Sequence, residues 1–276
     1  MPIKAVIFDI GGVVVGSPVA AIGRAEQQWS LPPHWLNAAI TARGEQGAFQ
    51  RLERGELGIE EFYRRFGEEL SEVGRGNEAY QAYCRKAGIE CPALPTEVKI
   101  DGRELWSIMM DPATEPDEVV VNAINRLRGS KLYKVAALTN NFAAAGHKPT
   151  RHRPASGANL KPVSTAELRA SLKAAAADPD SKGSGNDVLR SLFDEYIESC
   201  VEGLRKPDVK FFQLALDRIG VKAEETVFLD DIGHNLIVAR KMGIHTIRVH
   251  HGRSKEAIQE LERVLGTSLL QTPSKL

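Results

Sequence analysis

Four short apolar runs, separated by helix patterns, most constrain what this chain can fold into. They are IKAVIF (3–8), KVAALTN (134–140), TVFLDD (226–231) and HTIRVH (245–250). The first run is apolar at nearly every position, which is typical of a strand covered on both faces in a parallel sheet. Because strands and helices alternate, the sequence predicts right-handed βαβ units. We therefore expect an α/β fold with a Rossmann-like, three-layer parallel sheet.

Two of the helix patterns have recognisable ends. In EPDEVVVNAINRLRG, Pro116 suits the first helical position, and Gly129 is expected to end the helix. In KPDVKFFQLALDRIG, Phe212 and Leu216 lie on one apolar stripe, and Gly220 is expected to be a left-handed cap. Both helices are expected to cover the sheet.

Residues 16–115 have a different pattern. They contain no convincing strand but carry helical stripes such as IEEFYRRFGEEL, in which Phe62 and Phe66 are four residues apart. We expect an all-helical insertion, or cap, after the first strand. The α/β core would then consist of residues 1–15 and 116–276.

A third segment, residues 143–186, is rich in Ala, Gly, Pro, Ser and Lys and nearly empty of large apolar side chains. Such a composition buries too little apolar surface to offset the entropy of ordering the chain. The sequence predicts a mostly disordered insert within the core, with one short helix over 165–177.

Composition excludes some functions. Lys plus Arg and Asp plus Glu both number 36, so nothing points to nucleic acid or an anionic membrane as a partner. No stretch approaches the roughly 18 apolar residues of a membrane span, and Lys4 and Asp9 interrupt a signal-peptide pattern. We expect a cytoplasmic protein that acts on a small molecule.

Polar side chains follow the expected strands at the edge where open parallel sheets bind ligands, the carboxyl ends of the strands. These residues are Asp9, Thr139, Asn140, Asp230 and Asp231, and the turn before KPD adds Lys206. Phosphoryl transfer through an acyl-phosphate needs such a set: a carboxylate nucleophile, donors for phosphoryl oxygens, a cation, and acids that hold Mg²⁺. The residues predict this chemistry.

Two glycines directly follow Asp9. A tight turn at Gly11 and Gly12 would let backbone N–H groups approach a phosphate. The carbonyl of Gly11 could itself face the metal. We therefore place Gly12 among the substrate-binding residues and Gly11 among the metal ligands.

Four segments in this order, FDIGGVV, ALTNN, LRKPD and FLDDIGHN, resemble the four motifs of the haloacid dehalogenase superfamily. In its residue pattern the chain resembles one subgroup of this superfamily. That subgroup includes the N-terminal phosphatase-like domain of bifunctional soluble epoxide hydrolases and the related domain of acyl-CoA dehydrogenase family member ten. The resemblance covers roughly residues 1–142 and 187–255.

The resemblance implies a role for each matching position. It implies Asp9 as the nucleophile, and Thr139 and Asn140 as donors to the phosphoryl oxygens. Lys206 would stabilise the developing charge, and Asp230 would orient Lys206 or the metal shell. The implied Mg²⁺ ligands are Asp231, Asp9 and Gly11. Asn235 falls where the family often has a further acidic or amide group. Residues 16–115 would be the mobile cap that closes over the site and selects the substrate.

One position departs from the family pattern. Family phosphatases usually carry a second aspartate two residues after the nucleophile, which protonates the leaving alcohol and then activates water. That position is Gly11 here. Such proton transfer typically contributes about 10² to 10⁴-fold in rate. Four residues of the expected cap could take over this role, and the sequence does not rank them: His34, Glu45, Glu53 and Glu56.

The leading expectation is a Mg²⁺-dependent phosphatase of small phosphorylated metabolites. Because Gly11 provides no acid or base side chain, the protein could instead be a catalytically weak or inactive member that only binds phosphorylated ligands. A haloacid dehalogenase is a third alternative, but that reaction gains nothing from Mg²⁺, and the pair Asp230 and Asp231 argues against it. A fourth alternative is that the expected helical insertion (16–115) and the 143–186 insert serve as a scaffold for another protein.

Overall fold

The structure is a computed structural model, and it describes residues 1–142, 161–177 and 187–270. Its described strands form one parallel sheet in the order β3-β2-β1-β4-β5. The strands are β1 (Ala5–Phe8), β2 (Lys134–Thr139), β3 (Glu195–Glu198), β4 (Thr226–Asp230) and β5 (His245–Arg248). The predicted α/β fold with a parallel sheet is confirmed, and β1 lies at its centre.

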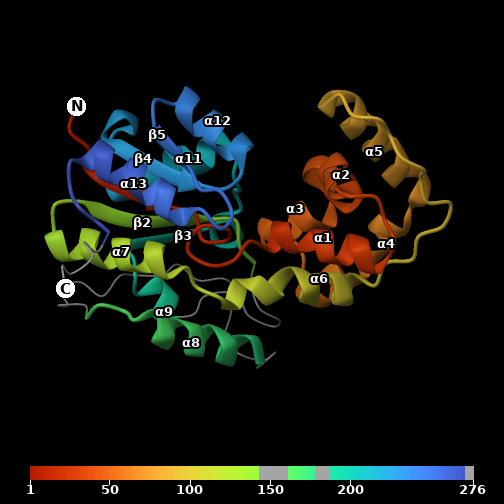
Figure 1. The fold of residues 1–276 in the computed structure, drawn as a ribbon, viewed down its shortest axis with the longest axis horizontal. Helices are drawn as coiled ribbons and strands as arrows, with labels where there is room; N and C mark the ends of the chain where they lie inside the picture. Colours follow the sequence, from red (N-terminus) through yellow and green to blue (C-terminus); the bar gives the residue numbers. More distant parts are fainter. Residues whose placement is uncertain (143–160, 178–186, 271–276) are drawn as a thin grey trace, which may run out of the picture.

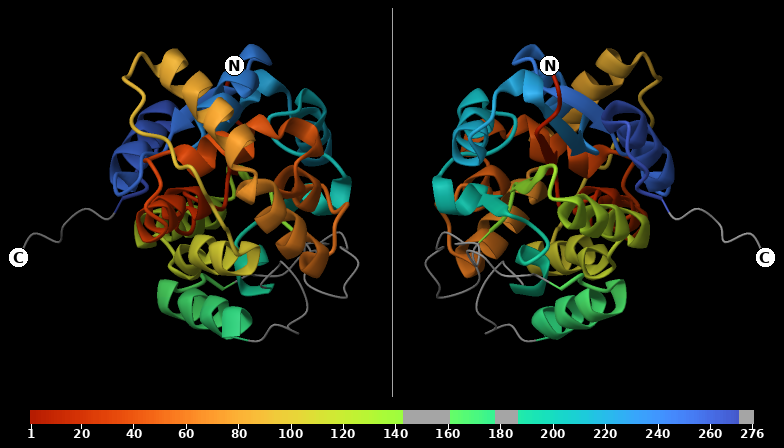
Figure 2. Two further views of the ribbon diagram at one scale, coloured as in Figure 1. Left: turned by 90° about the vertical axis from the view of Figure 1, so that its right-hand side faces the viewer. Right: turned by 90° about the vertical axis from the view of Figure 1, so that its left-hand side faces the viewer.

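Helices cover both faces of the sheet (Figures 1 and 2). Alternate residues of each strand point to opposite faces, so Val6 and Phe8 pack in one apolar cluster and Ala5 and Ile7 in another. The first face is covered by α7 (Glu118–Ser130) and α13 (Ser254–Leu265), the second by α11 (Val209–Ile219) and α12 (Gly233–Lys241). The sheet is therefore the middle of three layers.

The remaining helices outside residues 16–115 are short or flank the sheet. They are α8 (Thr165–Ala177), α9 (Asp187–Arg190), α10 (Ser199–Glu202) and the 3₁₀ turn η3 (Ala223–Glu225). Leu168 of α8 is fully buried, and the side chain of Asn125 donates to the carbonyl of Val163 at 2.8 Å. The helix expected at 165–177 is confirmed, and residues 161–177 are ordered against the core. The rest of the predicted insert, 143–160 and 178–186, lies outside the described residues, as does any scaffold role built on it.

Residues 16–115 form helices and no strand (Figure 1). They are α1 (Pro18–Gln28), α2 (Trp35–Ala42), η1 (Gly44–Gln46), α3 (Ala48–Glu53), α4 (Ile59–Ser71), α5 (Val73–Ala87), α6 (Gly102–Met110) and η2 (Asp111–Thr114). They gather beyond the carboxyl ends of the strands around their own apolar cluster, which includes Phe62, Phe66, Trp35 and Trp106. We call this part the helical segment.

Two chain crossings join the helical segment to the core, and they run side by side. Val15 and Pro116 form an antiparallel bridge, the N–H of Asp117 donates to the carbonyl of Val14 at 2.9 Å, and that of Gly16 donates to Glu115 at 3.1 Å. The entry to the helical segment and the exit from it therefore lie beside the end of β1.

Two expectations about elements were wrong. Helix α7 begins at Glu118, because the side chain of Asp117 caps it by accepting from Val120 N, and it ends at Ser130, where Lys131 is the C-cap in the left-handed conformation. Pro116 thus precedes the helix, and Gly129 lies inside it. Strand β3 was not expected at all.

Among the described helices, none is long and apolar enough to cross a bilayer.

Candidate functional site

The central strands deliver three carboxylates to one point. Phe8 of β1 pairs with Leu229 of β4, so the residues that follow, Asp9 and Asp230, end the two strands side by side. One oxygen of each of Asp9, Asp230 and Asp231 lies within 4.8 Å of the others. Parallel register thus brings together residues that are more than 200 positions apart in the sequence.

Lys206 enters this cluster from the loop after α10. Its Nζ lies 2.8 Å from Asp9 Oδ2 and 2.8 Å from Asp230 Oδ2, and only 1% of the residue is exposed. The side chain of Asn140 holds the loop, because its Oδ1 accepts from Lys206 N at 2.8 Å and its Nδ2 donates to Lys206 O at 3.1 Å. Both polar groups of Asn140 therefore position Lys206. The amide nitrogen has a second N–H, and the donation of Asn140 to a phosphoryl oxygen stays a prediction.

Asp230 already has a full set of protein partners. Besides Lys206, it accepts from Ile232 N at 2.7 Å, and the Asn235 amide lies 3.1 Å from each of its oxygens. The side chain of Asn235, where the family often has a further acidic or amide group, thus binds Asp230. A carboxylate with these four contacts is suited to orienting Lys206 rather than to holding a cation.

Asp231 has a different environment. Its Oδ2 accepts from the hydroxyl of Ser17 at 3.1 Å, whereas its Oδ1 is buried and has no hydrogen-bond partner in the described part of the chain. A buried carboxylate oxygen without a donor is costly unless a cation is bound to it. Asp9 and Asp231 therefore fit Mg²⁺, which prefers carboxylate and carbonyl oxygens.

Burial and the neighbouring charges shift the pKa values of the cluster. Burial raises the pKa of Asp9 well above its usual value, although Lys206 opposes the shift. Burial and the nearby charge of Asp230 raise the pKa of Asp231. Burial lowers the pKa of Lys206, but Asp230 and Asp9 outweigh it and the net change is upward. One ammonium does not balance three carboxylates, and a bound cation would.

The loop after β1 differs from expectation at Gly12. Its N–H, expected at the phosphate, donates instead to the carbonyl of Val15 at 2.8 Å. Gly12 has φ +81°, and a Cβ there would lie 2.1 Å from Asp231 Oδ2. Glycine is needed here because it lets the backbone lie against Asp231. A Cβ on Gly11 would lie 3.1 Å from Cδ of Pro18.

Thr139 ends β2 and is 4% exposed. Its Oγ1 donates to the carbonyl of Asn140 at 3.3 Å, which is a long hydrogen bond for a hydroxyl. A phosphoryl oxygen beside β2 could compete for this proton.

The helical segment contacts the Lys206 loop through Glu53. Its Oε2 lies 2.6 Å from Nε of Arg205, and its carbonyl accepts from the hydroxyl of Ser199. Burial raises the pKa of Glu53, although Arg205 opposes the shift. Three other candidates, His34, Glu45 and Glu56, are exposed, so Glu53 is the buried member of the four.

Sequence reasoning missed Ser17 and Arg205. Ser17 directly precedes Pro18, a common helix-start pattern, which could have marked it as an N-cap. Arg205 stands next to Lys206 in LRKPD, but nothing in the sequence pairs it with Glu53, which is 152 positions away.

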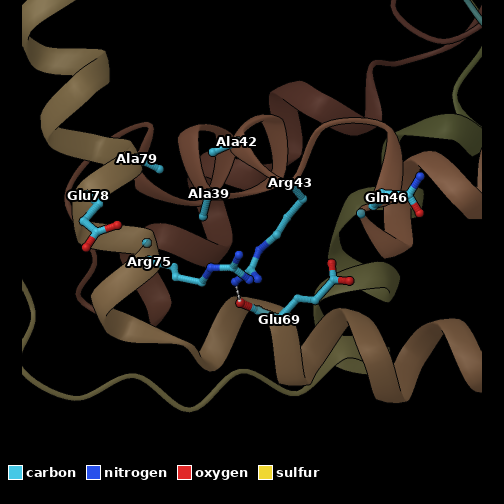
Figure 3. Close-up of a pocket in the computed structure, with 10 residues that line it drawn as sticks. Ala39, Ala42, Arg43, Gln46, Glu69, Arg75, Glu78 and Ala79 are labelled. Carbon is cyan, nitrogen blue, oxygen red and sulfur yellow. Dashed lines mark hydrogen bonds between the residues drawn. The ribbon is translucent and has the colours of Figure 1, made fainter.

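A separate pocket of about 440 Å³ lies within the helical segment, between α2, α4 and α5 (Figure 3). Arg43 and Arg75 extend into it, but both form ion pairs with Glu72, at 3.1 and 3.4 Å. None of the strand-end residues lines this pocket. It is therefore distinct from the carboxylate cluster.

Comparison with known proteins supplies a family. Residues 3–243 match the family model described as haloacid dehalogenase-like hydrolase. Acyl-CoA dehydrogenase family member 10 of Mus musculus is 32% identical over 266 residues, which is 96% of this chain and 19% of that protein. Bifunctional epoxide hydrolase 2 of Sus scrofa is 28% identical over 284 residues, 99% of this chain and 41% of that protein. The chain thus spans less than half the length of either relative.

A solved structure supports the fold. A HAD family enzyme of Bacteroides thetaiotaomicron aligns with a TM-score of 0.52 and 16% identity, over 94% of this chain and 99% of that chain. At this identity the likeness concerns the fold alone.

Proposed function

The chain belongs to the haloacid dehalogenase-like hydrolases, and we propose that it is a Mg²⁺-dependent phosphatase of small phosphorylated metabolites that reacts through an aspartyl-phosphate on Asp9. The observation that carries this proposal is the contrast between two neighbouring acids. Asp230 is fully engaged by protein donors, whereas Asp231 leaves one buried oxygen unpartnered beside Asp9. Hydrolysis of a carbon–halogen bond needs no such cation site, so the phosphatase is favoured over a dehalogenase.

Each residue has a task in this reaction. One oxygen of Asp9 attacks phosphorus, the P–O bond to the alcohol breaks, and the leaving alkoxide takes up a proton. Water then attacks phosphorus of the aspartyl-phosphate, which releases phosphate and restores the Asp9 carboxylate. Lys206, held 2.8 Å from Asp9, stabilises the negative charge on the phosphoryl group. Mg²⁺, when bound by Asp9, Asp231 and the carbonyl of Gly11, supplies positive charge against a dianionic substrate.

Proton transfer to the leaving group is the weak step, since Gly11 has no side chain to provide it. We assign a substitute role to Glu53, because it is buried where the helical segment meets the Lys206 loop and burial raises its pKa. A carboxyl with a raised pKa retains its proton closer to neutral pH. The helical segment would then act as a cap that supplies this acid.

Hydrolysis of p-nitrophenyl phosphate tests the proposal. This substrate has an activated leaving group, so the assay depends on Asp9 and the metal rather than on the acid. We expect activity with Mg²⁺, loss in EDTA, and a drop of at least about 10³-fold in Asp9→Asn. Asp217→Asn, on the exposed face of α11, is the matched control and should retain activity.

The second candidate, a phosphate-ligand binder without turnover, is favoured by Gly11 alone. Phosphate binding by calorimetry without any p-nitrophenyl phosphate turnover would support it and contradict the phosphatase. Release of halide from a 2-haloacid in the presence of EDTA would instead support the dehalogenase.

A further inference from the structure

Ser17 connects the carboxylate cluster to the helical segment. It lies between the loop that follows β1 and helix α1, and only 5% of it is exposed. Its hydroxyl donates to Asp231 Oδ2 at 3.1 Å and accepts from the N–H of Ala20 at 3.4 Å, as the N-cap of α1. A single hydroxyl thus binds an acidic side chain of the core and the first turn of the helical segment.

The contact also determines how Asp231 presents its oxygens. With Oδ2 held by Ser17, the buried Oδ1 is the oxygen that has no partner in the described part of the chain. The backbone of Gly12 packs against the same carboxylate, so little room remains for another orientation. Partners behind metal ligands typically contribute 10 to 100-fold to metal affinity.

We propose that Ser17 is a positioning residue that couples cation binding at Asp231 to the start of α1, an inference that rests on the proposed Mg²⁺ site. A cation that fixes Asp231 also fixes the Ser17 hydroxyl, and the fixed hydroxyl caps α1 better. By reciprocity, a well-capped α1 strengthens cation binding by the same factor. Cation occupancy would thereby be transmitted to the helical segment.

Calorimetric titration with Mg²⁺ tests the first half of the proposal. We expect Ser17→Ala to weaken Mg²⁺ binding about 10-fold or more, and Ser17→Thr, which keeps the hydroxyl, to bind nearly as wild type. Ser164→Ala is the matched control, because the Ser164 hydroxyl accepts from Glu167 N at 3.1 Å at the start of α8 and does not contact the cluster. It should bind Mg²⁺ as wild type does.

Hydrogen exchange tests the coupling itself. Mg²⁺ should slow exchange of the first amides of α1, including Ala20, in wild type and Ser17→Thr, but not in Ser17→Ala. Equal Mg²⁺ affinity in wild type and Ser17→Ala, or an unchanged exchange response in Ser17→Ala, would overturn the inference while leaving the phosphatase intact. Absence of Mg²⁺ binding by the wild type would overturn both proposals. Ser17→Thr keeps the test decisive if Ser17→Ala folds poorly.

Discussion

Lys206 carries a charge almost without exposure to water, and this is tolerated because Asp9 and Asp230 both lie 2.8 Å from it. The arrangement matters for reaction and for folding. The ammonium faces the proposed nucleophile, and it also keeps two buried carboxylates from repelling each other.

Replacing Lys206 by Met should therefore affect both properties. We expect activity on p-nitrophenyl phosphate to fall about 10² to 10³-fold, and stability in urea to fall by about 3–5 kcal/mol, because two buried acids lose their cation. Adding Asp230→Asn removes one of these charges and should restore part of the stability but none of the activity. If Lys206→Met alone were as stable as wild type, this account of the ion pairs would be contradicted.

Asp231 gives the expected pH dependence. Burial and Asp230 raise its pKa, so the folded protein binds this proton more tightly than the unfolded chain does. Stability without Mg²⁺ should therefore fall as pH rises from the usual aspartate range toward the raised pKa. Asp231→Asn, which is always neutral, should melt at a higher temperature than wild type in EDTA at about pH 7.

Mg²⁺ should reverse this order. Wild type gains stability from the bound cation, whereas Asp231→Asn should gain little. The melting temperatures of wild type and Asp231→Asn, measured in EDTA and in Mg²⁺, check the prediction. A lower melting temperature of Asp231→Asn than of wild type in EDTA would contradict it.

Gly12 permits a test of close packing. Gly12→Ala places a Cβ where it would lie 2.1 Å from Asp231 Oδ2, so Asp231 must move and Mg²⁺ binding should be lost. Gly44→Ala separates this effect from backbone strain, since Gly44 also has a positive φ (+57°) but open space around its Cβ. Gly44→Ala should cost stability yet bind Mg²⁺ normally. Equal Mg²⁺ affinity in Gly12→Ala and wild type would show that the close contact is unimportant.

At the scale of elements, short runs were enough to predict four strands. In β1, β2 and β4 nearly every residue is buried, which leaves a clear apolar pattern. In the edge strand β5 only Ile247 is buried. Strand β3, EYIE, was not expected: it is only four residues long and begins with a half-buried Glu195 at the edge of the sheet. Helix ends were less predictable than helix faces. Asp117 was available as a side-chain cap of α7, and its preference for that position outweighed the pattern at Pro116.

The strand-end acids were predictable for the same reason, since the carboxyl ends of parallel strands meet. Their individual partners were not. Ser17 with Asp231, Asn140 with the Lys206 backbone, and Glu53 with Arg205 are contacts between distant positions. Such pairs depend on how the segments pack, and no local sequence pattern encodes them.

At the scale of the whole molecule, the helical segment lies on the loops that hold the proposed reactive groups. Glu53 contacts Arg205 and Ser199, and Phe142, three residues after β2, packs edge-on against Trp106 at 4.8 Å between ring centres. The proposed cap is thus docked on the same loops that carry Asn140 and Lys206.

If Glu53 serves as the substitute acid, the leaving group should decide the effect of Glu53→Gln. Turnover of an alkyl phosphate should fall about 10²-fold, whereas turnover of p-nitrophenyl phosphate should change little. Gln can still accept from Arg205, so docking is retained. Glu56→Gln, at an exposed carboxyl, is the control. Equal losses on both substrates would assign Glu53 a structural role only.

The central claim is that Asp9 forms a covalent bond to phosphorus, and trapping that bond tests it most directly. The protein would be acid-quenched while it hydrolyses p-nitrophenyl phosphate with Mg²⁺, treated with borohydride, and digested for mass spectrometry. An aspartyl-phosphate is reduced by borohydride, so we expect homoserine at position 9 and an unchanged aspartate at 231. Continued turnover with Asp9 unmodified would contradict the account.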